Sequence, residues 1–376
     1  MKKPGLFMDD VHSQFFYLLR CALHNERPDS AIFSSVAGVR WHELYQMAAQ
    51  QALLGVIYDV VSALPESIQP ERPLRLKWFM AVQRIEQANL KLNKVLADIA
   101  HLMQKQQTDF FLLKGQGVAS FYPNPLRRQS GDIDLLFPSA TDFQKAHTWL
   151  RTMNLPDAVS VKHISFNMEG AHIEFHDRLE EMHYPPANRV MQQHFASYLE
   201  KGEYESLTVQ GCRIKGLPPE VNLVYMMLHI LNHLLTGGIG LRQWCDWALY
   251  AKYHQGKTDT GLMTRLLEKT GLTRFANAFA QIQHDYLGVP TAAIPYYFDT
   301  EPLSDCLLAD ILEGGNFGYH RKGKKRPAGK WRGKLHTADK IIRRGYRFFQ
   351  LSPAEAFWFP VHYSVCNVRM FLNERI

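Results

Sequence analysis

The chain has 376 residues, of which 46% are hydrophobic and 21% charged, a composition typical of a globular protein with a sizeable core. This length predicts two or three domains. No uninterrupted apolar stretch of about 18 residues occurs, and the N-terminus lacks the apolar segment of a signal peptide, so we expect a cytoplasmic protein with no membrane partner.

The net charge of +7 is unevenly distributed. Residues 320–347 contain twelve Lys or Arg and one acid, so the rest of the chain carries a net charge of about −4. The five cysteines are scattered and form no CxxC pair, which argues against a disulfide framework or a cysteine-based zinc site.

The N-terminal part of the chain is predicted to be helical. Apolar residues recur at helical spacing over 11–23, 41–61 and 78–107. We expect these segments to form a helical region over residues 1–105.

Strand and helix patterns alternate over residues 106–185. The apolar run 109–113 predicts a buried strand that ends in a sharp turn at Lys114-Gly115, and DIDLLF (132–137) predicts a second strand. A helix is expected over 139–153, followed by a hairpin whose turn is Glu169-Gly170. This region is therefore expected to form a small mixed sheet with flanking helices.

Residues 186–376 again show mostly helical patterns, with helices predicted over 221–235 and 241–253. The chain is thus predicted to be an α+β protein in three parts: a helical N-terminal region, a sheet-containing core over 106–185, and a helical C-terminal region that includes the basic stretch 320–347.

Two carboxylates lie on one face of the second predicted strand. Asp132 and Asp134 point the same way, about 6.6 Å apart along the strand, and they repel each other unless a cation lies between them. Mg²⁺ prefers oxygen ligands, and metal-assisted transfer of phosphorus groups uses such carboxylates. Glu174 on the hairpin is the candidate third acid. The alternative is a solvated strand end with exposed acids.

The Lys114-Gly115 turn favours a phosphate site. A strand, a turn with a cation and a helix start place backbone N–H groups where phosphates bind, although the P-loop motif is absent. Arg127 and Arg128 precede the aspartates, and two roles stay open for them: clamping a triphosphate, or pairing with nearby acids.

LLKGQGVASFYPNPLRRQSGDIDLLF, followed by HIEFHDRL, resembles the uncharacterised nucleotidyltransferase family of the polymerase-beta-like superfamily. The resemblance implies a nucleotidyltransferase-like core with Mg²⁺ or Mn²⁺ as cofactor and a nucleoside triphosphate such as ATP as substrate. It extends loosely to GLRQWCDWALY. The residues that match the family's motifs are Lys114, Gly115, Arg128, Asp132, Asp134, Glu174 and His176.

The implied roles follow the motif. Asp132 and Asp134 are expected to be catalytic metal ligands, and Glu174 to complete the site as a metal ligand or as a base for the acceptor hydroxyl. Lys114, Gly115 and Arg128 are expected to bind the nucleotide. His176 is expected to support the ligands, although Asp177 follows it where the family has an aromatic residue. Gln116 replaces the Gly or Ser of the wider superfamily, so either Lys114 takes over the phosphate contact or triphosphate binding is weak.

Two features of the C-terminal region have open roles. Arg242 is expected either to face the nucleotide or to pair with Asp246. His229 and His233 have zinc-ligand spacing but lack the intervening Glu, so we expect structural histidines.

The basic stretch 320–347, with Trp331, His336 and Tyr346, fits a nucleic-acid partner, another anionic partner or a solvated loop.

The sequence therefore predicts a Mg²⁺-dependent nucleotidyltransferase that moves a nucleoside monophosphate to an unknown acceptor and releases pyrophosphate. Two alternatives stay open. One is a non-catalytic nucleotide- or nucleic-acid-binding module on the same fold. The other is a toxin- or antitoxin-type nucleotidyltransferase that acts on protein or tRNA.

Overall fold

The computed structural model describes residues 10–34, 39–153, 155–159, 163–321 and 329–373, which divide into two compact units. The sheet unit consists of the described residues of Met8–Leu179 and Phe195–Leu223. The helical unit consists of Glu180–His194 and the described residues of Val224–Ile376.

The sheet unit contains the N-terminal helices as well as all seven strands. Its elements are α1 (Asp10–His24), α2 (Ala31–Ser34), α3 (Trp41–Gln50), α4 (Leu54–Ser62), α5 (Arg72–Lys105), β1 (Phe111–Leu113), α6 (Gly115–Ala119), η1 (Pro125–Arg127), β2 (Asp132–Leu136), α7 (Ala140–Thr152), β3 (Asp157–Val159), β4 (His163–Met168), β5 (Ala171–His176), β6 (Glu205–Val209) and β7 (Cys212–Gly216). Helices α8 (Pro185–Leu199) and α9 (Pro219–Thr236) each run across a boundary between the units.

The seven strands form one mixed sheet in the order β3-β4-β5-β2-β1-β7-β6. The pairs β2–β5 and β1–β7 are parallel, and the other neighbours are antiparallel. The predicted hairpin is present as β4–β5, with Met168 opposite Ala171 across the Glu169-Gly170 turn. The predicted α+β class with a small mixed sheet is confirmed.

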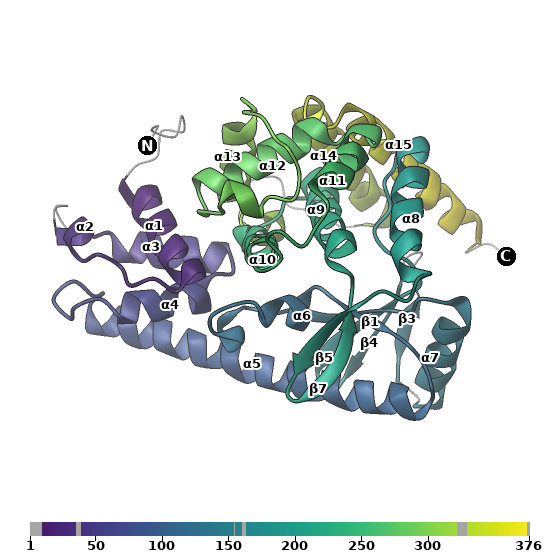
Figure 1. Cartoon of the computed structure of the whole chain (residues 1–376), viewed down its shortest axis with the longest axis horizontal. Coiled ribbons are helices and arrows are strands. Elements are labelled where there is room, and N and C mark those ends of the chain that lie inside the picture. The colour runs from purple at the N-terminus through teal and green to yellow at the C-terminus, as the bar shows by residue number, and fades with distance from the viewer. Residues whose placement is uncertain (1–9, 35–38, 154, 160–162, 322–328, 374–376) are drawn as a thin grey trace. The chain divides into compact units, whose positions relative to one another are not determined.

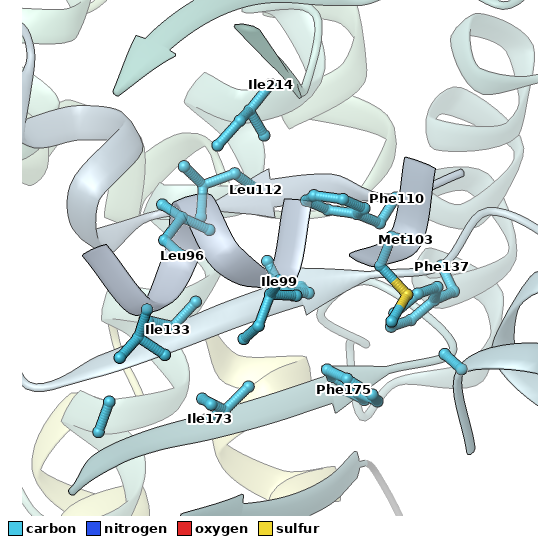
Figure 2. Packing of buried hydrophobic residues seen from close by; sticks show 14 of the residues in the cluster. Leu96, Ile99, Met103, Phe110, Leu112, Ile133, Phe137, Ile173, Phe175 and Ile214 are labelled. Carbon is cyan, nitrogen blue, oxygen red and sulfur yellow. The ribbon is translucent and has the colours of Figure 1, made fainter. Parts of the chain in front are cut away.

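One face of this sheet is apolar and covered by helices. The long α5 lies next to the strands in Figure 1, and Figure 2 shows Leu96, Ile99 and Met103 of α5 against side chains of β1, β2 and β5. Ile133 and Ile173, on the paired strands β2 and β5, are both 0% exposed. Burial of such side chains stabilises the fold by roughly 1.5–3 kcal/mol each. The alternate residues of β2 and β5 are thereby directed to the opposite face.

The segment 41–61 is helical as predicted, but it forms two helices because the chain turns between α3 and α4. Ala52 adopts a left-handed backbone (φ 58°), and the N–H of Leu53 donates to the carbonyl of Ala48, which closes α3 as a glycine would. An alanine carries no sequence signal for this conformation. Helix α5 also begins earlier than expected, at Arg72, with Pro73 in its first turn, where proline is tolerated.

The helical unit contains α10 (Leu241–Tyr253), α11 (Thr260–Lys269), α12 (Thr273–Asp285), η2 (Thr291–Ala293), α13 (Ser304–Gly314), η3 (Asn316–Gly318), α14 (Lys330–Phe348) and α15 (Pro353–Asn373). Of the basic stretch 320–347, residues 322–328 lie outside the described residues, and α14 contains most of the remainder. Across the described residues, no helix is both long enough and apolar enough to cross a membrane.

A buried asparagine joins α5 to the loop before β2. Asn89 is 3% exposed, and its Nδ2 donates to the carbonyl oxygens of Leu126 (2.8 Å) and Arg128 (2.7 Å). Buried carbonyl groups without a donor are costly, so this one side chain fixes the segment that leads into Asp132.

We therefore expect Asn89→Ala to lower the free energy of unfolding by about 1–3 kcal/mol, because two carbonyl groups lose their donor. The shift of the urea unfolding midpoint measures it. Asn93→Ala, on the same helix, is the matched control and is expected to have a clearly smaller effect. Equal shifts for both variants would contradict the assigned role of Asn89.

Candidate active site

The face of the sheet opposite the apolar core carries a set of titratable side chains. Parallel pairing of β2 with β5 places Asp132 opposite His172 and Asp134 opposite Glu174. Antiparallel pairing of β5 with β4 places His163 opposite His176. Because paired residues of neighbouring strands point to the same side, these side chains share one face.

Asp134 and Glu174 lie at the centre of this face, bridged by one imidazole. His176 Nε2 lies 3.0 Å from Asp134 Oδ1 and 3.4 Å from Glu174 Oε2. Glu174 Oε1 is also 3.6 Å from His163 Nε2 and 3.5 Å from His172 Nε2. The side chain of Asp134 is 2% exposed and that of Glu174 is 19% exposed, so negative charge is concentrated in a partly desolvated place.

The pKa values of His176 and Glu174 are shifted by the charges around them. Burial lowers the pKa of His176, but hydrogen bonds with Asp134 and Glu174 outweigh burial and raise the pKa to about 9. Burial raises the pKa of Glu174, and the hydrogen bond with His176 and the nearby His163 overcome this and lower it. His176 is therefore a cation at neutral pH and Glu174 an anion, and a positive charge already lies between the two carboxylates.

Lys114 lies beside Asp134 at a strained turn. Its Nζ is 3.5 Å from Asp134 Oδ2, and its backbone has a positive φ of 42°. Such a conformation is unfavourable for a residue with a Cβ and occurs where the surrounding structure enforces it.

Gly115 also has a positive φ, of 43°, and a Cβ there would lie 3.2 Å from the carbonyl oxygen of Asp132. The predicted Lys-Gly turn is thus present, and it brings the lysine ammonium to the carboxylates.

Gln116, the first residue after the turn glycine, is 3% exposed. Neither polar atom of its side chain has a hydrogen-bond partner among the described residues. Buried polar atoms are usually satisfied, so an unsatisfied amide here needs a reason. The buried amide of Gln116 thus follows the turn directly without a hydrogen-bond partner among the described residues.

The two arginines before β2 differ in their surroundings. Arg127 pairs with Asp59 (Nε to Oδ1, 3.0 Å) and with Glu86 (Nη1 to Oε1, 3.1 Å), so of its two open roles the structure supports pairing with acids. Arg128 is 3% exposed, and its Nη1 donates to Ser130 Oγ at 2.8 Å. Its assignment to nucleotide binding stays a prediction.

The remaining candidate, Arg242, is on α10 in the helical unit and is 8% exposed. Its Nη2 donates to the side-chain oxygen of Gln243 at 2.9 Å. Its role at the nucleotide stays a prediction. His229, in the same unit, pairs with Glu180 (Nδ1 to Oε1, 2.8 Å), and its ring is 4.4 Å from that of His233.

Two overlapping sets of donors on the polar face suit different metals. Asp132, Asp134 and Glu174 offer only oxygens, as Mg²⁺ and Mn²⁺ prefer, but the oxygens of these three side chains do not all lie within 4.8 Å of one another. His163, Glu174 and His176 offer two nitrogens and one oxygen within 4.8 Å of one another, the one such group of three among the described residues. Imidazole donors favour Zn²⁺, Fe²⁺ and Ni²⁺. Glu174 belongs to both sets.

His163 was not identified from the sequence, although the signal was present. Because the Glu169-Gly170 turn fixes the register of the hairpin, counting back from Met168 opposite Ala171 places His163 opposite His176. The histidine therefore joins the polar face through strand pairing rather than through any local motif.

The sequence matches the family model described as "Uncharacterised nucleotidyltransferase" over residues 37–288. No curated protein matches the chain. A solved structure, an antigenic nucleotidyltransferase-like protein from Paracoccidioides brasiliensis, is similar at 12% sequence identity and a TM-score of 0.36, over 55% of this chain and 94% of that one.

The family match covers more than half of the chain, including the Lys-Gly turn, the aspartate pair and the glutamate strand. These are the segments whose pairing builds the polar face of the sheet. The chain therefore belongs to the uncharacterised nucleotidyltransferase family.

Proposed function

We propose that the protein transfers a nucleoside monophosphate from a nucleoside triphosphate to an acceptor hydroxyl group and releases pyrophosphate, with Mg²⁺ or Mn²⁺ as cofactor. The observation that carries this proposal is the register of β2 and β5, which sets Asp134 beside Glu174 on the face that also carries Asp132. Membership of a nucleotidyltransferase family supports the same reaction class.

The donor chemistry fits a hard divalent ion. The chain itself supplies cations to these carboxylates. The imidazolium of His176 lies beside both Asp134 and Glu174, and the ammonium of Lys114 lies beside Asp134. A divalent ion held by Asp132, Asp134 and Glu174 would neutralise the triphosphate and lower the pKa of the acceptor hydroxyl. Glu174 is assigned as a ligand or as the base that activates the acceptor hydroxyl, because it is paired with Asp134 across the two strands and its pKa is lowered by the hydrogen bond with His176.

In the proposed reaction the acceptor oxygen forms a bond to the α-phosphorus. The bond from this phosphorus to the oxygen that bridges to the β-phosphate breaks, and pyrophosphate leaves. The hydroxyl proton passes to water or to a carboxylate of the site. Because this chemistry depends mainly on position and charge, the rigid sheet that holds the carboxylates is the main contribution of the protein.

Lys114 is proposed to bind the departing phosphates. Its ammonium already lies next to Asp134, and the turn that carries it places the N-terminus of α6 close to β2. The buried amide of Gln116, which lacks a partner among the described residues, lies next to the same turn in sequence. Arg128 is proposed as a further triphosphate contact on the family's pattern, held in place through its backbone by Asn89.

The reaction class is tested by incubating the purified full-length chain with each labelled nucleoside triphosphate, Mg²⁺ or Mn²⁺, and a cell extract. Pyrophosphate release coupled to a labelled product supports the proposal, and the product identifies the acceptor. Nucleotide binding without any pyrophosphate release would instead favour the non-catalytic binding module.

We expect Asp132→Asn and Asp134→Asn each to lower transfer at least about a hundredfold, since even indirect partners of a metal contribute ten- to a hundredfold. Initial rates of pyrophosphate release measure this effect, and circular dichroism checks that each variant folds. Asp98→Asn removes an exposed carboxylate of α5 that pairs with Lys94, and it is expected to keep the wild-type rate. Full activity of both site variants would contradict the assigned ligands.

The two donor sets can be separated by metal titration. Because Mn²⁺ prefers oxygen ligands, Asp132→Asn is expected to weaken Mn²⁺ binding at least tenfold and His163→Ala to change it less than about threefold. Isothermal titration calorimetry of the metal-free protein provides the dissociation constants. Should His163→Ala weaken Mn²⁺ more than Asp132→Asn does, the metal is held by the histidine set instead.

A further inference from the structure

A cluster of cations in the helical unit surrounds one buried carboxylate. Asp310 is 0% exposed at its side chain and pairs with Arg321 Nη2 (2.9 Å), Arg344 Nη2 (2.8 Å) and Arg347 Nε (3.1 Å). Glu313 adds a second acid, 2.8 Å from Arg321 Nη1. A buried carboxylate is stabilised by such pairs, but three arginines already exceed these two acids by one positive charge.

A further cation is Lys340. Residues 340, 344 and 347 are spaced to lie on one face of α14, so this face presents three like charges. Like charges four residues apart destabilise a helix. Taking Arg321 and Lys340 with Arg344 and Arg347, four cations stand against two carboxylates, which leaves a net charge of +2.

Lys340 is half-buried and no described carboxylate pairs with it. Burial, followed by the neighbouring Arg344 and Arg321, lowers the pKa of its ammonium. A lysine that served only the fold would find an acid or extend into water, because an unpaired ammonium is costly to desolvate.

Two glycine turns create space for Lys340 and Arg321. A Cβ at Gly237 would lie 3.2 Å from Lys340 Nζ, and one at Gly238 would lie 3.9 Å from Arg321 Nη2. A Cβ at Gly318 would lie 2.1 Å from the carbonyl oxygen of Gly237, so the two turns meet without side chains. The side chains of Lys340 and Arg321 therefore both lie against this glycine pair, and a Cβ at Gly237 would crowd the ammonium of Lys340.

We infer that this cluster, defined by Arg321, Lys340 and the Gly237-Gly238 turn, binds the phosphate group of a small ligand. A dianionic phosphate matches the net charge of +2. It would accept a hydrogen bond from Lys340, with which no described carboxylate pairs, and the positive charge of Arg321 would attract it. Neither the carboxylates of the sheet nor a metal is needed for this binding. In this inference Arg321 and Lys340, which belong to the basic stretch 320–347, bind a ligand instead of forming part of a solvated loop.

The inference is tested by titrating the full-length protein with inorganic phosphate and with pyrophosphate in a calorimeter, at constant ionic strength. Lys340→Met is expected to weaken binding roughly tenfold to a hundredfold, the effect of one charge-assisted hydrogen bond, and Lys340→Arg to retain most of it. Lys269→Met, an exposed lysine of α11 in the same unit, is the matched control and is expected to bind as the wild type does.

A stability measurement separates a ligand site from a structural role. Because the fold disfavours the charged form of Lys340, Lys340→Met is expected to leave the unfolding midpoint without phosphate unchanged or to raise it. Phosphate is then expected to raise the midpoint of the wild type but not of the variant. A lower midpoint for Lys340→Met without phosphate would show a protein partner for the lysine and overturn the inference.

Two other outcomes would overturn it. If Lys114→Met abolishes phosphate binding while Lys340→Met does not, the phosphate occupies the nucleotide site of the sheet unit instead. If an oligonucleotide binds with strong salt dependence while phosphate and pyrophosphate do not, the cations form an extended polyanion surface rather than a site for one phosphate group.

Discussion

The parallel pairing of β2 with β5 is the constraint on which the rest of the site depends. On one face of these strands Ile133, Leu135, Ile173 and Phe175 are all 0% exposed, so neither strand can slip by a single residue without exposing its apolar set. The same register holds Asp134 beside Glu174 on the opposite face. Hydrophobic burial on one face of the strands thus holds two carboxylates near each other on the opposite face, although they repel.

That repulsion explains the cations around it. His176 lies between the two carboxylates and is protonated, Lys114 approaches Asp134 from a strained turn, and two more imidazoles contact Glu174. Strand pairing and turn geometry therefore assemble the site, and they place a basic side chain beside each of these two carboxylates. In the function that we propose, a divalent ion would take the place of these internal cations beside the carboxylates.

Much of this arrangement could be predicted from the sequence because it depends on local patterns. Alternation in DIDLLF and AHIEFH fixes which residues share a face, and the Glu169-Gly170 turn fixes the hairpin register. The features that could not be predicted depend on tertiary contacts. The break after α3 requires a left-handed alanine at Ala52, and the pairing of Arg127 with Asp59 joins residues far apart in the chain. The contacts of Lys340 likewise follow from the packing of separate helices.

Helix α5 serves two parts of the sheet unit at once, and this limits how the chain can vary. Near its middle Asn89 holds the loop that leads to Asp132, and farther along the helix Leu96, Ile99 and Met103 lie under the sheet. Each inserted residue would turn one part of a helix against the other by about 100°. The number of residues between Asn89 and Leu96 is therefore constrained. Substitutions on the exposed side of this stretch are tolerable, whereas an insertion or deletion would prevent Asn89 from binding the loop while Leu96 packs under the strands.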